Sequence, residues 1–197
     1  MSVSFDKSET RVNLMRAFAG ESQARNRYTF AAGLAKKKNL QVIQGVFTFT
    51  ANQEEQHAKV YYNLLEKLSG QTVGIDGTYP VELFPDLLQH LRAAQHNEYQ
   101  EWDHDYRHFA EVAKSEGFEE ISHTFSSIAD IEKTHGDRFG RFAELMEQGK
   151  LFVSDVECKW MCLNCGQIIN AKEAPKVCPI CKHPQGFFVR WEMAPFE

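Results

Sequence analysis

Hydrophobic residues recur at steps of three and four along four long segments, at residues 8–35, 40–68, 82–115 and 118–147. This spacing places them on one side of an α-helix, so each segment is predicted to be an amphipathic helix whose apolar stripe faces a shared core. In the third segment the predicted stripe runs from Leu87 through Glu98 to His108 and Val112. All four stripes also carry glutamate, and two of them carry a histidine three residues after it.

The breaks between these segments predict how the helices connect. Three lysines and Asn39 mark a short turn after the first segment, and Gly117 marks another before the fourth. A longer glycine-containing stretch separates the second segment from the third and ends at Pro80. One long crossover among short turns is typical of a ferritin-like four-helix bundle, and we predict this all-α fold for residues 1–149.

The polar residues on the stripes form a pattern of metal ligands. Glu54 and His57 lie three residues apart, as do Glu132 and His135, and residues at that spacing project from the same helix face. One such pair is ordinary on a helix. Two pairs, with glutamates on the other two helices, match a carboxylate-bridged di-iron or di-manganese site. The candidate ligands are Glu21, Glu54, His57, Glu98, Glu101, Glu132 and His135.

The bundle segment also contains an internal repeat. A shift of 78 positions places Tyr28 on Tyr106, Glu54 on Glu132, His57 on His135, and Glu21 on Tyr99, next to Glu98. We interpret the two halves as copies of one helical hairpin that face each other across a pseudo-twofold axis. The matched tyrosines are either core aromatics or hydrogen-bond donors to the ligand glutamates.

Beyond Gly149 the helical period ends. We predict a linker at 150–158 and a small domain of β-strands and metal knuckles at 159–197, too small to bury much core by itself. Its cysteines, Cys162, Cys165, Cys178 and Cys181, form two Cys-x-x-Cys pairs that could close around one metal. Taken alone, these cysteines favour a structural zinc ribbon. Attachment to a di-metal bundle favours iron instead, because iron can carry electrons.

Composition and charge narrow the class of protein. Apolar residues make up 43% of the chain, enough for a packed core, and the net charge of -5 with scattered lysine and arginine argues against a nucleic-acid partner. The N-terminus has no apolar signal region, and no run of about 18 apolar residues occurs. We therefore expect a soluble cytoplasmic protein with no membrane partner, in which reduced cysteines serve as ligands.

Taken in order, the motifs FAGESQARNRY, EEQHAK and EYQEW, a second Glu-x-x-His, CxxCG and CPxCxHP resemble the rubrerythrin family over essentially the whole chain. The resemblance implies two non-haem irons in the bundle and, at 159–197, a rubredoxin-like domain that holds one iron in a tetracysteinate site. It implies a homodimer, in which the tetracysteinate site of one subunit lies near the di-iron site of the other. A departure is Lys182, which stands where free-standing rubredoxins usually have glycine.

The resemblance also implies a role for each ligand. Glu54 and Glu132 would bridge the irons, Glu21 would be a terminal ligand of the first, Glu98 and His135 would be terminal ligands of the second, and His57 and Glu101 would exchange at the first as its oxidation state changes.

The activity implied by the resemblance is reduction of hydrogen peroxide to water in oxidative-stress defence. Electrons would come from NAD(P)H through a separate reductase or rubredoxin, since the chain has no glycine-rich dinucleotide fingerprint. Two alternatives are an iron-handling ferroxidase and a bundle fused to a structural zinc ribbon. Iron storage has no use for the thiolate domain, and the zinc-ribbon reading leaves the buried carboxylates unexplained.

Overall fold

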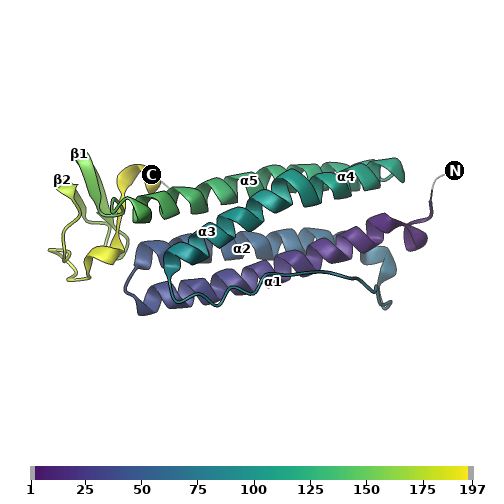
Figure 1. Ribbon diagram of the computed structural model, residues 1–197, viewed down its shortest axis with the longest axis horizontal. Helices are drawn as coiled ribbons and strands as arrows, with labels where there is room; N and C mark the ends of the chain where they lie inside the picture. Colours follow the sequence, from purple (N-terminus) through teal and green to yellow (C-terminus); the bar gives the residue numbers. More distant parts are fainter. Residues whose placement is uncertain (1–2, 195–197) are drawn as a thin grey trace.

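The computed structural model describes residues 3–194 and confirms the predicted class, a helical bundle followed by a small sheet (Figure 1). The bundle helices are α1 (Glu9–Lys37), α2 (Gln41–Leu64), α3 (Leu87–Gln100), α4 (Tyr106–Ser115) and α5 (Glu119–Glu147). A π turn, Glu101–Asp105, joins α3 to α4, so the two together form the third rod of the bundle. Short 3-10 turns lie at Phe5–Lys7, Glu66–Leu68, Gln185–Phe187 and Trp191–Met193.

The third and second helices are shorter than the sequence pattern predicts. The third begins at Leu87 instead of 82, because Pro85 precedes it and the Asp86 side chain accepts a hydrogen bond from the Leu88 backbone N–H. The second ends at Leu64, after which the chain turns.

The crossover, residues 69–86, contains no helix or strand and runs along α1 (Figure 1). Two arginines of α1 hold it: Arg16 lies 2.6 Å from Asp76, and Arg27 lies 2.6 Å from Glu82. The second pair is nearly buried, and Asn97 of α3 also donates to Glu82 at 2.6 Å. These contacts fix the crossover between the first hairpin and the third helix.

The π turn changes the register of the third rod, so the stripe predicted through His108 and Val112 is wrong in its second half. His108 is exposed, and the buried positions after the turn are Tyr106, Ala110 and Ala113. A π turn accommodates one extra residue in a helix. The repeat is therefore offset by 77 before the turn, matching Glu21 with Glu98, and by 78 after it.

The apolar core falls into two clusters on either side of the polar residues. One cluster, toward the sheet end of the bundle, contains Tyr28, Phe47 and Phe139. The other contains Tyr61, Tyr106, Phe125 and their neighbours. The polar residues therefore lie midway along the bundle, between two layers of aromatic side chains.

The sheet has the order β2-β1-β3, with both pairs antiparallel. Its strands are β1 (Val153–Cys162), β2 (Ile168–Glu173) and β3 (Phe188–Arg190). Most of the predicted linker thus lies in β1, while the division into domains at 149 and 158 stays a prediction. Trp160 and Phe188 fill the small core of the sheet.

The sheet domain sits on one end of the bundle (Figure 1). Val189 and Ala194 pack into the nearer bundle cluster. At the turn between α1 and α2 the approach is so close that a Cβ added to Gly186 would lie 1.8 Å from the Asn39 carbonyl oxygen. Only glycine fits there without moving the backbone.

Candidate metal centres

Six of the seven predicted bundle ligands converge at the middle of the bundle. Glu21 comes from α1, Glu54 and His57 from α2, Glu98 from α3, and Glu132 and His135 from α5. All six are buried. The seventh, Glu101, lies in the π turn and is partly exposed.

Two glutamates span the two histidines. Glu54 places one carboxylate oxygen 3.1 Å from Nδ1 of His57 and the other 3.0 Å from Nδ1 of His135. Glu132 does the same, at 2.9 and 2.8 Å. The imidazole rings are nearly parallel, with centroids 5.5 Å apart. Each histidine therefore faces one oxygen of each glutamate, the arrangement expected of two carboxylates shared by two metal ions.

The remaining glutamates divide between the two histidines. An oxygen of Glu21 lies 3.9 Å from Nδ1 of His57, and an oxygen of Glu98 lies 3.4 Å from Nδ1 of His135. The centre thus has two halves, a Glu21 side containing His57 and a Glu98 side containing His135.

The polar atoms of this centre fit a pair of cations. Among the described residues 3–194, the buried ligand atoms without a hydrogen-bond partner include Oε2 of Glu21, both carboxylate oxygens of Glu54 and Glu132, Oε2 of Glu98, and Nδ1 of His57 and His135. A buried, unpaired carboxylate carries a desolvation penalty of several kcal/mol. Metal ions bound between these atoms would satisfy all of them, and mixed carboxylate and imidazole ligands suit iron.

Burial and mutual repulsion set the protonation of the metal-free centre. Burial, with the other carboxylates, raises the pKa of Glu98 to about 8 and holds the pKa of Glu21 well above its usual range. Glu132 is also buried, but the two histidines lower its pKa to about 2. Although burial disfavours charged imidazole, the facing carboxylates raise the pKa of His57 to about 9. Metal binding must therefore displace protons.

Two tyrosines support the glutamates from the opposite half of the bundle. The hydroxyl of Tyr106 donates to Oε1 of Glu21 at 2.6 Å, and the hydroxyl of Tyr28 donates to Oε1 of Glu98. Each hydrogen bond occupies Oε1 of its glutamate and leaves Oε2 buried without a hydrogen-bond partner. The pair obeys the pseudo-twofold relation and fixes the orientation of both glutamates.

A cavity of about 480 Å³ lies beside the Glu21 side, because Tyr106, the hydrogen-bond partner of Glu21, forms part of its wall. Glu101 and Tyr106 line it, together with Arg27 and crossover residues 76–80. An added Cβ at Gly20 would lie 4.0 Å from a Glu101 carboxylate oxygen, so the side chain of Glu101 passes over this position. Glu101 therefore stands between the cavity and the buried ligands.

One buried polar residue near the centre was not among the sequence candidates. Tyr61 is fully buried one helical turn beyond His57. The internal repeat could have identified it, because a shift of 78 places Tyr61 on Phe139 and so marks a polar residue matched with an apolar one.

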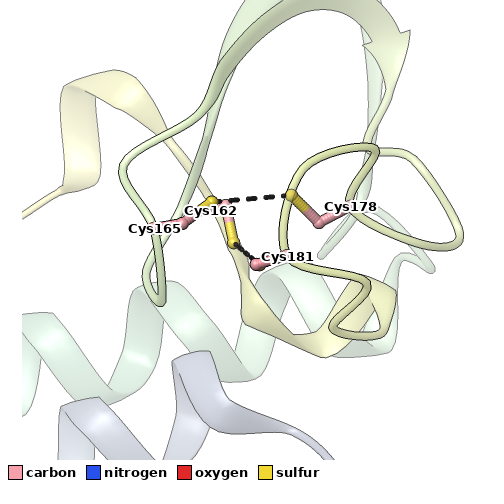
Figure 2. Close-up of side chains that lie close together, drawn as sticks. All are labelled: Cys162, Cys165, Cys178 and Cys181. Atoms are coloured by element: carbon pink, nitrogen blue, oxygen red, sulfur yellow. Dashed lines mark hydrogen bonds between the residues drawn. The ribbon is translucent and has the colours of Figure 1, made fainter.

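The four paired cysteines form a second centre in the sheet domain (Figure 2). Sγ of Cys162 lies 3.6 Å from Sγ of Cys181, and the same distance separates Cys165 from Cys178. A disulfide would need about 2 Å. Sulfurs at the corners of a tetrahedron with metal bonds of about 2.3 Å lie about 3.8 Å apart, so the spacing fits one tetrahedral ion.

Backbone N–H groups point at these sulfurs from both knuckles. The N–H of His183 lowers the pKa of Cys181 to about 5, whereas burial raises that of Cys162 to about 12. After the first knuckle Gly166 takes a φ of 74°, and after the second Lys182 takes a φ of 63°. Lys182 therefore adopts the left-handed conformation that glycine adopts at the matching position.

The fold and the two centres define a ferritin-like di-iron carboxylate bundle joined to a rubredoxin-like domain. Two family models match the chain, "Rubrerythrin" over residues 12–143 and "Rubrerythrin, rubredoxin-like domain" over residues 160–189. The chain belongs to the rubrerythrin family. Its cofactors are the two irons of the carboxylate site and one iron held by the four cysteines.

Curated relatives cover nearly the whole chain. The rubrerythrin of Porphyromonas gingivalis is 44% identical, covering 95% of this chain and 92% of the relative. The rubrerythrin of Nitratidesulfovibrio vulgaris is 40% identical, covering 92% and 93%. Among solved structures, fully reduced, all-ferrous nigerythrin matches with a TM-score of 0.63 and 26% identity, covering 97% of this chain and 89% of that one. Within residues 3–194 no helix is long and apolar enough to cross a membrane.

Proposed function

We propose that this protein reduces hydrogen peroxide to water with electrons that originate in NAD(P)H and enter through the tetracysteinate site. Membership of a family of oxidoreductases that defend against oxidative stress supports the chemistry. The observation that carries the proposal is the presence on one chain of a dinuclear carboxylate site and a separate one-iron thiolate site. The dinuclear site would serve the two-electron reduction of peroxide, and the one-iron site would serve as a one-electron carrier.

The ligand roles we propose follow the distances. Glu54 and Glu132 would bridge the two irons, since each offers one oxygen to each histidine. Glu21 completes the first side and Glu98, with His135, the second. His57 and Glu101 would be alternative ligands on the first side: His57 lies against Glu54 and Glu132, whereas Glu101 lies in the π turn at the wall of the cavity.

When bound, the two irons supply the electrons and the Lewis acidity that cleave the O–O bond. The chain supplies the rest. Tyr28 and Tyr106 keep the terminal glutamates oriented, while the flanking aromatic layers exclude water. The cavity beside Glu101 admits a small polar substrate to the Glu21 side.

Electron delivery favours a homodimer. Glu54 lies 13 residues after the start of α2, about 20 Å along the helix axis, and the sheet domain that contains the four cysteines lies beyond that end of the bundle (Figure 1). That separation is long for a single electron step within one chain. We propose that the tetracysteinate site of a second copy serves each di-iron site, and that a cytoplasmic reductase or rubredoxin reduces it.

The test compares the iron-loaded protein with the double variant Cys162→Ser and Cys165→Ser. Chemically reduced and given one equivalent of peroxide, both should be oxidised at the same rate in stopped flow. Supplied with NADH and a rubredoxin reductase, the variant should lose nearly all steady-state turnover. Unchanged steady-state turnover would contradict the relay, and rapid oxidation by dioxygen with ferrous ion but not by peroxide would favour a ferroxidase.

A further inference from the structure

The two halves of the bundle match closely enough for a single difference between them to be informative. In one half, the ring centroid of Phe139 lies 5.0 Å from Tyr28 and 5.1 Å from Phe47. In the other half, the equivalent distances are 5.5 Å from Tyr61 to Tyr106 and 5.1 Å from Tyr61 to Phe125. The same three-ring cluster therefore caps each side of the metal centre.

Within these clusters one atom breaks the match. Tyr61 occupies the position of Phe139 and differs by its hydroxyl. That hydroxyl is fully buried, and among residues 3–194 it has no hydrogen-bond partner. A buried hydroxyl without a partner is unfavourable, and the apolar alternative is present on the same chain at Phe139. The hydroxyl is therefore expected to have a partner that is not part of the protein.

The position of Tyr61 indicates where this partner lies. Tyr61 is one turn beyond His57, so the two side chains share a face of α2. Its ring packs on Tyr106, whose hydroxyl is already used by Glu21. Burial, and after it the charge of Glu21, holds the pKa of Tyr61 well above its usual range, so the hydroxyl keeps its proton.

The same side carries the other departure from the repeat. Glu101 opens the π turn and corresponds to Gln23 or Ala24, depending on which offset is applied, so only one side has a glutamate there. Glu101 and Tyr106 line the cavity. The side that borders the cavity is thus the side with an unused hydrogen-bond donor.

We propose that the Tyr61 hydroxyl donates a hydrogen bond to the peroxide held on the Glu21 side, which makes Tyr61 a substrate-binding residue. This rests on the proposed function. The hydroxyl keeps its proton, and its role is to orient the substrate and to favour its binding on this side over the Glu98 side, where Phe139 offers no donor.

The test uses azide as a small acceptor in place of peroxide, titrated into the oxidised, iron-loaded protein and followed by difference absorbance. Tyr61→Phe should raise the Kd for azide about tenfold, the loss expected for one hydrogen bond. Tyr62→Phe, which alters the exposed neighbour of Tyr61, should leave the Kd unchanged. Only iron-loaded protein gives the signal, so partial loading does not affect the Kd.

A double variant, Tyr61→Phe with Phe139→Tyr, moves the hydroxyl to the Glu98 side and should bind azide as weakly as Tyr61→Phe. An unchanged Kd in Tyr61→Phe would overturn the proposal, as would full recovery in the double variant. Both results are independent of turnover. If the wild type fails to reduce peroxide while Tyr61→Phe still weakens azide binding, the proposed function fails and the assignment of a donor on the Glu21 side stands.

Discussion

The two metal centres of this chain are built on different scales. The carboxylate centre draws its buried ligands from four helices, between Glu21 and His135 in sequence. The thiolate centre is contained between Cys162 and Cys181, in two local turns, and Cys165 is exposed. The first centre therefore requires the whole bundle to be assembled, whereas the second can form within its own small domain and presents one edge to a partner.

The largest expected effect tests whether the two centres are independent. Glu54→Ala or Glu132→Ala removes an oxygen from both metal positions, and either variant should lose both bundle irons while keeping the thiolate iron. Metal analysis should show that the iron content falls from about three irons per chain to about one. The red colour of the ferric tetracysteinate site should be retained. The control Glu55→Ala alters an exposed neighbour paired with Arg25 at 3.2 Å and should keep full iron content. Loss of the red colour in Glu54→Ala would contradict the independence of the centres.

Removing iron should reveal the protons that the carboxylate centre binds when no metal is present. In the metal-free folded chain, the pKa of Glu98 is raised from 4.5 to about 8 and that of His57 from 6.5 to about 9. Between pH 5.5 and 8 the folded chain then holds more protons than the unfolded one, so its free energy of unfolding should fall as pH rises. Iron-loaded protein should show the opposite slope, because protons compete with metal for the ligands. Urea unfolding at pH 5.5, 7 and 8 measures both, and parallel slopes would count against this account.

The contact between the two domains predicts a smaller effect. Gly186→Ala forces a Cβ against the Asn39 carbonyl, and overpacking of this kind costs about 1–3 kcal/mol. We expect a lower thermal midpoint and faster proteolysis between α5 and β1. Gly45→Ala adds the same methyl where nothing lies within 4 Å and should show neither change. Equal proteolysis rates for the two variants would show that the domains are not held by this contact.

The smallest effect concerns the second knuckle. Lys182→Gly relieves a left-handed residue and should stabilise the thiolate domain by about 1 kcal/mol, less the loss of an exposed hydrogen bond from Lys182 Nζ to the Pro179 carbonyl. The inverse change, Gly166→Ala, places a side chain at a φ of 74° and should destabilise the same domain. The denaturant midpoint for loss of the red absorbance reports both. A lower midpoint for Lys182→Gly would show that the lysine contact outweighs the backbone strain.

The sequence predicted the overall class, and it identified the candidate ligands that the structure brings together in two clusters, because short, regular spacings encode both. Glu-x-x-His pairs and Cys-x-x-Cys pairs are local patterns, and helical periodicity reports the face of each helix. Three features depend on packing between distant segments and could not be predicted from local spacing. They are the π turn, the contact of Gly186 with Asn39, and the ion pairs of Arg16 and Arg27 with the crossover. The π turn did leave a signal, because Glu21 aligned with Tyr99 one position away from Glu98.

The π turn has a genetic consequence. It corresponds to one extra codon in the second half of a repeated hairpin, and it separates Glu98 from Tyr106 by eight residues where Glu21 and Tyr28 are separated by seven. A base substitution can exchange tyrosine for phenylalanine and be reversed by another. An inserted codon cannot be reversed by any substitution, and its removal would rotate Tyr106, Ala110 and Ala113 away from their buried positions. The unequal halves of this bundle are therefore protected against drifting back to symmetry.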